Sequence, residues 1–300
     1  MGKIYDTLVR SRRELKKFPQ EDKLFNDLFL KKREQERQAP PHPEEAKQKA
    51  VQQQERPVAS VRSTALTGYQ VPAHESGIDQ RMLVYYEPRS GVAEQFRIIR
   101  ARLRRFAQDK QHKTLLVSST KPQEGKSFVA ANLAISIAQE AKSPVLLIDG
   151  DLRKPSVHKL FGLSAVRGFA DYLMGEASLE EITRATEIEG LYLLPAGAPP
   201  ANPAELISSQ LLKSMLDEVK TKYGECWIIF DSTPIESTPE PTILIEHADG
   251  CIFVVQADSA DRKLIKDAVG ELDGNKILGV VFNRANYHLT PYYYYPQKVK

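Results

Sequence analysis

One stretch of the chain has the residue types and spacing of a phosphate-binding loop. Residues 118–127 read SSTKPQEGKS and lie between an apolar run and a helical pattern, although Thr120 stands where the general motif has its first glycine. In such a loop, backbone N–H groups and a helix N-terminus cradle phosphate, the lysine of Gly125-Lys126-Ser127 reaches the β and γ phosphates, and the serine binds Mg²⁺. We therefore expect these residues to bind nucleotide: Gln123, Glu124, Gly125, Lys126, Ser127 and Phe128.

Three aspartates end apolar runs that have the composition of buried strands. Asp149 and Asp151 flank Gly150 in VLLIDGD, and Asp231 ends CWIIFD. Carboxylates this close repel one another unless a cation is near, and the Mg²⁺ that accompanies nucleotide phosphates is such a cation. The alternative for the first pair is a turn with acidic caps. Together with the loop, the pattern predicts a nucleotide site with these Mg²⁺ ligands: Ser127, Asp149, Asp151 and Asp231.

The elements that must position these residues alternate between strands and helices. We predict strands at 114–118, 145–149, 191–194, 227–231, 252–256 and 277–282, and helices at 126–140, 203–222 and 261–272. Near-continuous apolar strands that alternate with helices indicate an α/β fold, doubly wound, with a mostly parallel sheet covered on both faces. Such sheets bind ligands at the carboxyl ends of their strands, where the loop and the aspartates lie.

The composition limits the class of protein. The formal net charge of +3 is a small excess for 300 residues, so nothing in the overall charge indicates a nucleic-acid partner. Cys226 and Cys251 each border an apolar run, which indicates buried thiols in a reducing compartment. Because no stretch approaches the roughly 18 apolar residues of a membrane span and the start lacks a signal-peptide pattern, we expect a cytoplasmic protein.

Composition also divides the chain into four parts. Residues 1–38 have apolar residues at helical spacing among alternating charges, which predicts an amphipathic helical arm, either solvated or docked on a partner. Residues 39–81 have the composition of a disordered linker. Residues 82–285 carry the nucleotide-binding elements, and residues 286–300 form a tail with four consecutive tyrosines. Since no single face of a helix or strand can bury four consecutive side chains, we expect the tail to be solvated.

The order of the motifs resembles one family. EGKS, LLIDGDLRKPSVHKLFGL, LLPAG, ANPAELI and IIFDS, followed by C-terminal tyrosines, are similar to the bacterial tyrosine kinases of exopolysaccharide and capsule biosynthesis. These have a phosphate-loop (P-loop) NTPase fold of the deviant-Walker type. The resemblance extends from about residue 82 to the end, and the initial GKIYDTL resembles stand-alone members associated with exosortase-type polysaccharide loci.

The resemblance implies an autokinase that uses ATP and Mg²⁺ and controls polysaccharide polymerisation or export. By position, Lys126 would stabilise charge on the transferring phosphoryl group, Asp149 would help remove the tyrosine proton, and Asp151 would support the metal together with Asp231. The tail of one subunit would enter the site of its neighbour. The matching phosphate acceptors are Tyr287, Tyr292, Tyr293, Tyr294 and Tyr295.

A further match is EQFRIIR, which resembles the family's Glu-x-x-Arg-x-x-Arg helix. Three-residue spacing puts Glu94, Arg97 and Arg100 along one helical face, where they would join subunits into a ring-like homo-oligomer. A merely solvated face is the alternative. The family also implies a membrane chain-length-determining adaptor, which would bring the protein to the inner face of the plasma membrane, and a tyrosine phosphatase.

Two departures keep a second interpretation open. Gln123 follows Pro122 where the family has glycine, and residues 232–235 read STPI where the family has a hydroxyl residue and two prolines. Lys121 stands at the signature lysine of partitioning and division-site ATPases. The alternative function is therefore a nucleotide-switched ATPase scaffold or adaptor with little or no kinase activity.

Overall fold

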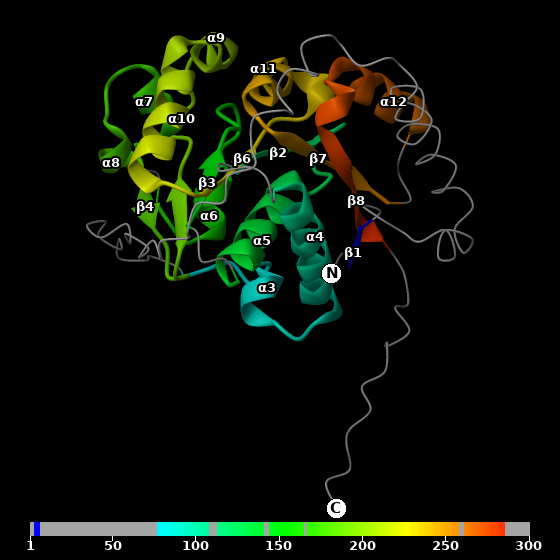
Figure 1. Ribbon diagram of the computed structural model, residues 1–300. Coiled ribbons are helices and arrows are strands. Elements are labelled where there is room, and N and C mark those ends of the chain that lie inside the picture. The colour runs from blue at the N-terminus through cyan, green and yellow to red at the C-terminus, as the bar shows by residue number, and fades with distance from the viewer. Residues whose placement is uncertain are drawn as a thin grey trace, which may run out of the picture.

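Eight strands form one sheet in the computed structural model, which describes residues 3–6, 77–107, 113–140, 144–164, 167–257 and 261–285. Their order across the sheet is β1-β8-β7-β2-β6-β3-β5-β4 (Figure 1). The strands are β1 (Lys3–Asp6), β2 (Lys113–Ser119), β3 (Val145–Asp149), β4 (Arg184–Ala185), β5 (Leu191–Leu194), β6 (Trp227–Asp231), β7 (Gly250–Gln256) and β8 (Ile277–Ala285). The six strands from β8 to β5 run parallel, whereas β1 and β4 pair antiparallel at the two edges.

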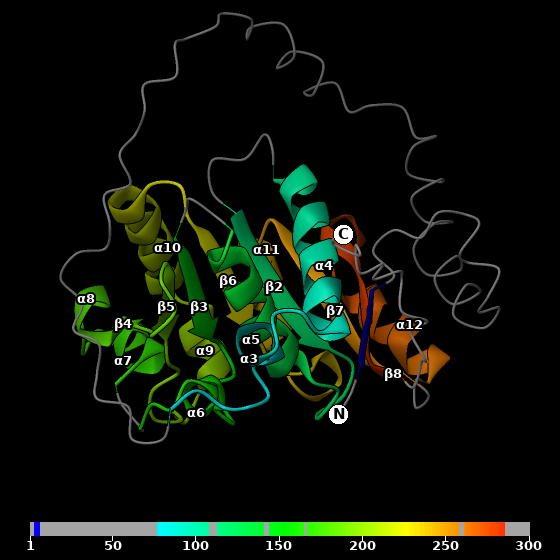
Figure 2. The ribbon, with the colours of Figure 1, turned by 90° about the horizontal axis from the view of Figure 1, so that it is seen from below.

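Helices cover both faces of the sheet (Figure 1, Figure 2). One layer contains α3 (Leu83–Tyr86), α4 (Gly91–Phe106), α5 (Lys126–Ala138) and α6 (Val157–Leu160). The other contains α7 (Phe169–Leu173), α8 (Leu179–Ile182), α9 (Pro203–Ile207), α10 (Gln210–Tyr223), α11 (Glu240–His247) and α12 (Arg262–Glu271), and the short 3₁₀ helices are η3 (Ile235–Ser237) and η4 (Gly274–Lys276). The predicted doubly wound, mostly parallel α/β fold is confirmed.

Strand alternation explains the two layers. In β2, Leu115 and Val117 pack into the apolar cluster under α4 and α5, while Leu116 faces the cluster under the opposite layer. Since successive side chains of a strand point to opposite faces, a strand covered on both sides must be apolar throughout. β3 and β6 follow the same rule, and all five residues of each are buried. Strands buried on both faces can therefore be recognised in the sequence as continuous apolar runs.

Helix α5 is the buried centre of its layer. It begins after Gly125, whose φ of 95° is left-handed, and residues 129–138 are all buried. A helix that is apolar on all sides belongs in a core and not at a surface. It packs against β2, β3 and β6, so its first turn is fixed at the carboxyl edge of these strands.

Three expectations differ from the structure. The single helix expected at 203–222 is two helices, because Ser208 donates its hydroxyl to Ala204 O and Ser209 takes an extended conformation; serine competes with the helix backbone in this way. At the start of the chain, Lys3–Asp6 form a strand on β8 and not a helix. The folded part begins before the expected Met82, since Ile78 is 5% exposed and packs in the core. The rest of the arm and most of the linker lie outside the described residues.

Asn132 provides a test of how α5 supports the chain before it. Its buried side chain accepts the N–H of Val84 at 3.0 Å and donates to Phe128 O at 3.0 Å. Asn132→Leu leaves the Val84 N–H without a partner, so we expect the free energy of unfolding to fall by about 1–3 kcal/mol in urea titrations. The matched control, Asn275→Leu at an exposed position, should change it by less than about 0.5 kcal/mol. Equal effects of the two variants would contradict this account.

Candidate nucleotide and phosphoryl-transfer site

The phosphate loop is fixed at both of its ends. Glu124 accepts the N–H of Lys121 at 2.8 Å through Oε2 and that of Gln256 at 3.4 Å through Oε1. From the end of β8, the Asn283 amide donates to Glu124 O at 2.8 Å. The same amide lies so close to Gly125 that a Cβ there would meet its nitrogen at 1.9 Å. The left-handed φ and this contact together require glycine at position 125.

The three aspartates converge where β3 and β6 end. Asp149 lies opposite Asp231 in the register of the two strands, and all three carboxylates are buried. Asp149 accepts the N–H groups of Ser156 and Val157, each at 3.0 Å, through Oδ2. Gly150 donates its N–H to Asp231 O at 2.7 Å, which ties the β3 end to its neighbour. The predicted grouping at the carboxyl edge is therefore what the structure shows.

Lys126 joins the loop to these carboxylates. Its Nζ lies 3.3 Å from Asp151 Oδ2, and both side chains are largely buried. Burial works against the charged ammonium, but Asp231 and Asp151 outweigh it and raise the pKa of Lys126. The lysine is therefore charged and oriented towards the end of β3 before any ligand arrives.

The buried carboxylates are short of positive charge. Burial and the neighbouring Asp231 raise the pKa of Asp149 to about 8, and burial raises the pKa of Asp231 to about 6 against the opposing effect of Lys126. Neither oxygen of Asp231 receives a hydrogen bond of good geometry from the described residues, although the Ser127 hydroxyl is close enough to favour its charged form. A cation beside Ser127 and Asp231 would satisfy these oxygens.

The donor set suits Mg²⁺ but does not enclose it. Ser127 and Asp231 offer only oxygen ligands, which hard cations prefer. Within the part of the chain that the structure describes, no group of three or more His, Cys, Asp or Glu comes together as a metal cage. Asp149 is held by backbone N–H groups and Asp151 by Lys126. The arrangement fits Mg²⁺, which usually keeps waters and binds through one or two protein groups plus phosphates.

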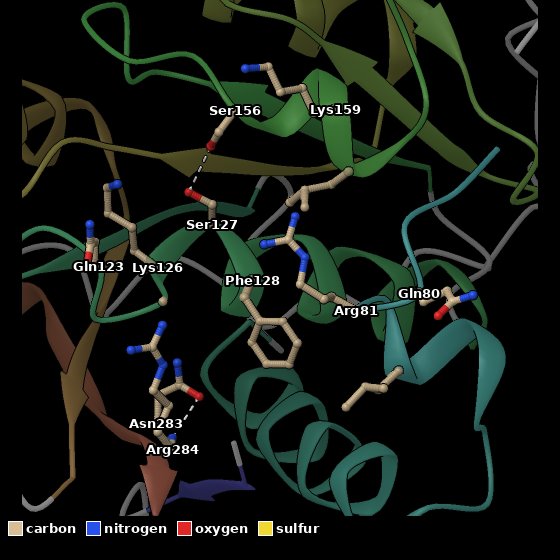
Figure 3. Close-up of a pocket in the computed structure, with 13 residues that line it drawn as sticks. Gln80, Arg81, Gln123, Lys126, Ser127, Phe128, Ser156, Lys159, Asn283 and Arg284 are labelled. Carbon is tan, nitrogen blue, oxygen red and sulfur yellow. Dashed lines mark hydrogen bonds between the residues drawn. The ribbon is translucent and has the colours of Figure 1, made fainter. Parts of the chain in front are cut away.

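A cavity of about 640 Å³ opens beside the loop (Figure 3). Its walls come from four segments far apart in the sequence. They are Gln80, Arg81, Leu83, Gln123, Gly125, Lys126, Ser127, Phe128, Ser156, Lys159, Leu160, Asn283 and Arg284. The sequence predicted the cavity residues that belong to the loop, but not the residues from other segments that lie beside them. Asn283 and Arg284 carried one signal, since they are polar residues directly after the apolar part of the last strand. Ser156, Lys159 and Leu160 lie in the motif LLIDGDLRKPSVHKLFGL, whereas the residues from 80–83 carried no signal.

The residues expected at a subunit interface lie on α4. Glu94 pairs with Arg97 at 2.7 Å on the exposed side of the helix. Arg100 is only 15% exposed, pairs with Glu140 and donates to Ser136 O at 2.6 Å. Arg100 therefore attaches α4 to α5 within the chain, which leaves Glu94 and Arg97 as the more accessible pair. The tyrosines expected as phosphate acceptors, from Tyr287 onwards, lie outside the described residues.

Comparisons with known proteins agree with the geometry of this site. A family model described as the CobQ/CobB/MinD/ParA nucleotide binding domain matches residues 115–292. Tyrosine-protein kinase YwqD of Bacillus subtilis is 36% identical over 210 residues, which are 69% of this chain and 87% of that protein. The chain belongs to the bacterial tyrosine kinases. The predicted resemblance is confirmed, and the nucleotide-binding domain of this kinase is the part that contains the loop and the aspartates.

Further relatives agree. The putative tyrosine-protein kinase CapB of Staphylococcus aureus is 32% identical over 71% of this chain and 93% of its own length. Among solved structures, the chimerical protein CapA2B2 has a TM-score of 0.62 at 29% identity and covers 68% of this kinase and 89% of that chain. The VpsO kinase domain has a TM-score of 0.56 at 33% identity, and the match covers 66% of this kinase and 100% of that chain. In the described part of the kinase, every helix is too short or too polar to span a membrane.

The backbone at Gln123 gives a second prediction. Its φ of 66° is left-handed, which costs a residue with a Cβ roughly 1–2 kcal/mol. Gln123→Gly removes this strain and adds the smaller entropy cost of glycine, so we expect about 0.5–1 kcal/mol more stability in urea unfolding. Gln123→Ala keeps the Cβ and serves as the matched control, with no gain expected. Equal stability of the Gly and Ala variants would show that the position is unstrained.

The raised pKa values predict how stability depends on pH without Mg²⁺ and nucleotide. The pKa of Asp149 rises from 3.8 to about 8 on folding, so its contribution to stability is complete below about pH 4 and is lost as the pH rises to about 8. We expect the free energy of unfolding, measured in EDTA, to fall between pH 6 and 8, above the raised pKa of Asp231, by at most about 1.4 kcal/mol per pH unit. Asp149→Asn should remove most of this slope.

The exposed Asp217 supplies the control for that measurement. Asp217→Asn should keep the slope of the unmodified protein. A slope that persists unchanged in Asp149→Asn would show that other groups cause the pH dependence.

Proposed function

We propose that this kinase is an ATP- and Mg²⁺-dependent autokinase that transfers the γ-phosphoryl group of ATP to the C-terminal tyrosines of a neighbouring copy. The observation that carries the proposal is the convergence of Lys126 and three buried carboxylates at the edge where the phosphate loop ends. By similarity to the tyrosine-protein kinases above, the proposed role is control of capsule or exopolysaccharide synthesis. The proposed acceptors are Tyr287, Tyr292, Tyr293, Tyr294 and Tyr295.

In this mechanism the tyrosine oxygen attacks the γ phosphorus, the bond to the β-phosphate oxygen breaks, and ADP leaves. Lys126, already charged, would stabilise the charge on the transferring group. Mg²⁺, when bound with ATP beside Ser127 and Asp231, would neutralise phosphate charge. Because phosphoryl transfer depends mainly on positioning and electrostatics, few protein groups are needed.

Asp149 is the proposed acceptor of the tyrosine proton. A general base works best when its pKa lies near the operating pH, and burial raises the pKa of Asp149 from its ordinary value towards that range. The N–H groups of Ser156 and Val157 hold one of its oxygens and fix its orientation. Asp151 supports the site indirectly, because its contact with Lys126 positions the ammonium.

The tail would reach its site by assembly of several copies. The proposed contact uses Glu94 and Arg97, whose side chains are exposed, because Arg100 is mostly buried against α5. Each phosphate adds a charge of about −1.5 to −2, so several on one tail would repel one another and favour release. A membrane adaptor and a tyrosine phosphatase complete the proposed cycle, and the adaptor would bring the kinase to the membrane.

A second candidate function is a nucleotide-switched scaffold. Gln123 favours it, because this residue takes a left-handed conformation at a position where the resembling kinases have glycine, and a changed loop geometry would slow transfer without preventing binding. The two functions differ in one observable: a scaffold binds ATP but leaves the tail unmodified.

The test is incubation of the purified chain with Mg-ATP, followed by mass spectrometry of the C-terminal peptide. We expect phosphate on the tyrosines of the tail, and a loss of at least about a hundredfold in Lys126→Met. Lys213→Met is the matched control, since Lys213 is exposed on α10 and does not line the cavity. An unmodified tail in a protein that binds Mg-ATP, with the adaptor present, would refute the autokinase.

A further inference from the structure

The wall of the cavity that faces the phosphate loop is a rigid part of the fold. It is formed by residues 77–84, at the N-terminal side of α3. Asp79 donates its N–H to Leu160 O at 3.0 Å, and Gly162 packs so closely on Gly77 that a Cβ would meet its carbonyl oxygen at 2.3 Å. From α5, Asn132 binds the backbone of the segment at Val84. The segment is thus attached to α5 and to the end of α6, two elements that also line the cavity.

Arg81 is held in a fixed orientation on this wall. Asp79 accepts Nε of Arg81 at 2.9 Å and Nη2 at 2.8 Å, and also its backbone N–H at 2.8 Å. Such a two-pronged contact orients the planar guanidinium and leaves Nη1 available for a ligand. Figure 3 shows the Arg81 side chain extending towards Ser127 and Phe128, at the first turn of α5. An otherwise exposed arginine is therefore preorganised in front of the phosphate-binding turn.

The charges around the cavity indicate an anionic ligand. Four of its lining residues are cationic, namely Arg81, Lys126, Lys159 and Arg284, and the lining contains no acidic residue. Lys126 comes from the phosphate loop, whereas Arg81 comes from the opposite wall. Cations on two walls of one cavity raise the local concentration of anions and hold a phosphate chain from both sides. Asp79 does not line the cavity, and both of its oxygens bind Arg81.

We propose that Arg81 is a second phosphate-binding group of the nucleotide site, contacting the phosphate chain from the wall opposite Lys126, with Asp79 as its positioning residue. The inference rests on the nucleotide binding assumed in the proposed function but not on phosphoryl transfer. It assigns a role to a segment that precedes the phosphate loop by about forty residues. An arginine suits this role because its remaining donor can reach a phosphate oxygen while the fork stays on the carboxylate.

The experiment is calorimetric titration of the full chain with Mg-ADP and with Mg-pyrophosphate, at two salt concentrations. Arg81→Gln should weaken both ligands about tenfold, the equivalent of one charge-assisted hydrogen bond, and should reduce the salt dependence of binding. Asp79→Asn should weaken both by a smaller factor. Arg89→Gln, an exposed arginine outside the cavity, is the matched control and should change neither.

Two results would overturn the proposal. Unchanged affinity in Arg81→Gln, with an unchanged unfolding midpoint, would show that Arg81 does not contact the ligand. A loss for Mg-ADP without a loss for Mg-pyrophosphate would assign Arg81 to the nucleoside instead of the phosphates. Absence of tail phosphorylation would leave this inference intact, because the titration measures binding alone.

Discussion

The burial of three carboxylates beside one lysine is the constraint on which the rest of the site depends. Asp149 and Asp231 are side by side because β3 and β6 are neighbours, and Lys126 faces them because α5 lies over both strands. Isolated buried charges of one sign are unfavourable, so the site is incomplete as protein alone. Because the buried carboxylates lack positive charge, the site favours a ligand that carries a cation with it.

The apolar core supplies the stiffness that this arrangement needs. Strands buried on both faces and a fully buried α5 leave the first turn of the helix little freedom to move. Asn283 then fixes the loop from β8, a strand that is three places from β6 in the sheet. The helix, the loop and the three strand ends therefore behave as one rigid unit. This rigidity positions the side chains with the precision of a hydrogen bond, which phosphate chemistry requires.

The sequence predicted those parts of the fold that follow from local patterns. The apolar runs of β3, β5 and β6 gave the strand limits to the residue, since both faces of these strands are buried. The short strand β1 could not be found, because its pairing partner β8 lies at the far end of the chain. The same holds in the site. The loop and aspartates have a motif, whereas Arg81 and Asn283 reach the cavity only through tertiary packing.

The position of β1 has a practical consequence for experiments on the kinase. Lys3 pairs with Ala285, so the first described residue and the last lie at one corner of the sheet, next to Asn283 and Arg284. An affinity tag or fluorescent protein fused before Lys3 would stand beside Ala285, after which the tyrosine tail follows in the sequence, and close to residues that line the cavity. The turn at Gly224 and Glu225 is exposed and precedes β6, so it opens on the opposite edge of the sheet. A label inserted there would report on the protein without crowding the edge where the chemistry takes place.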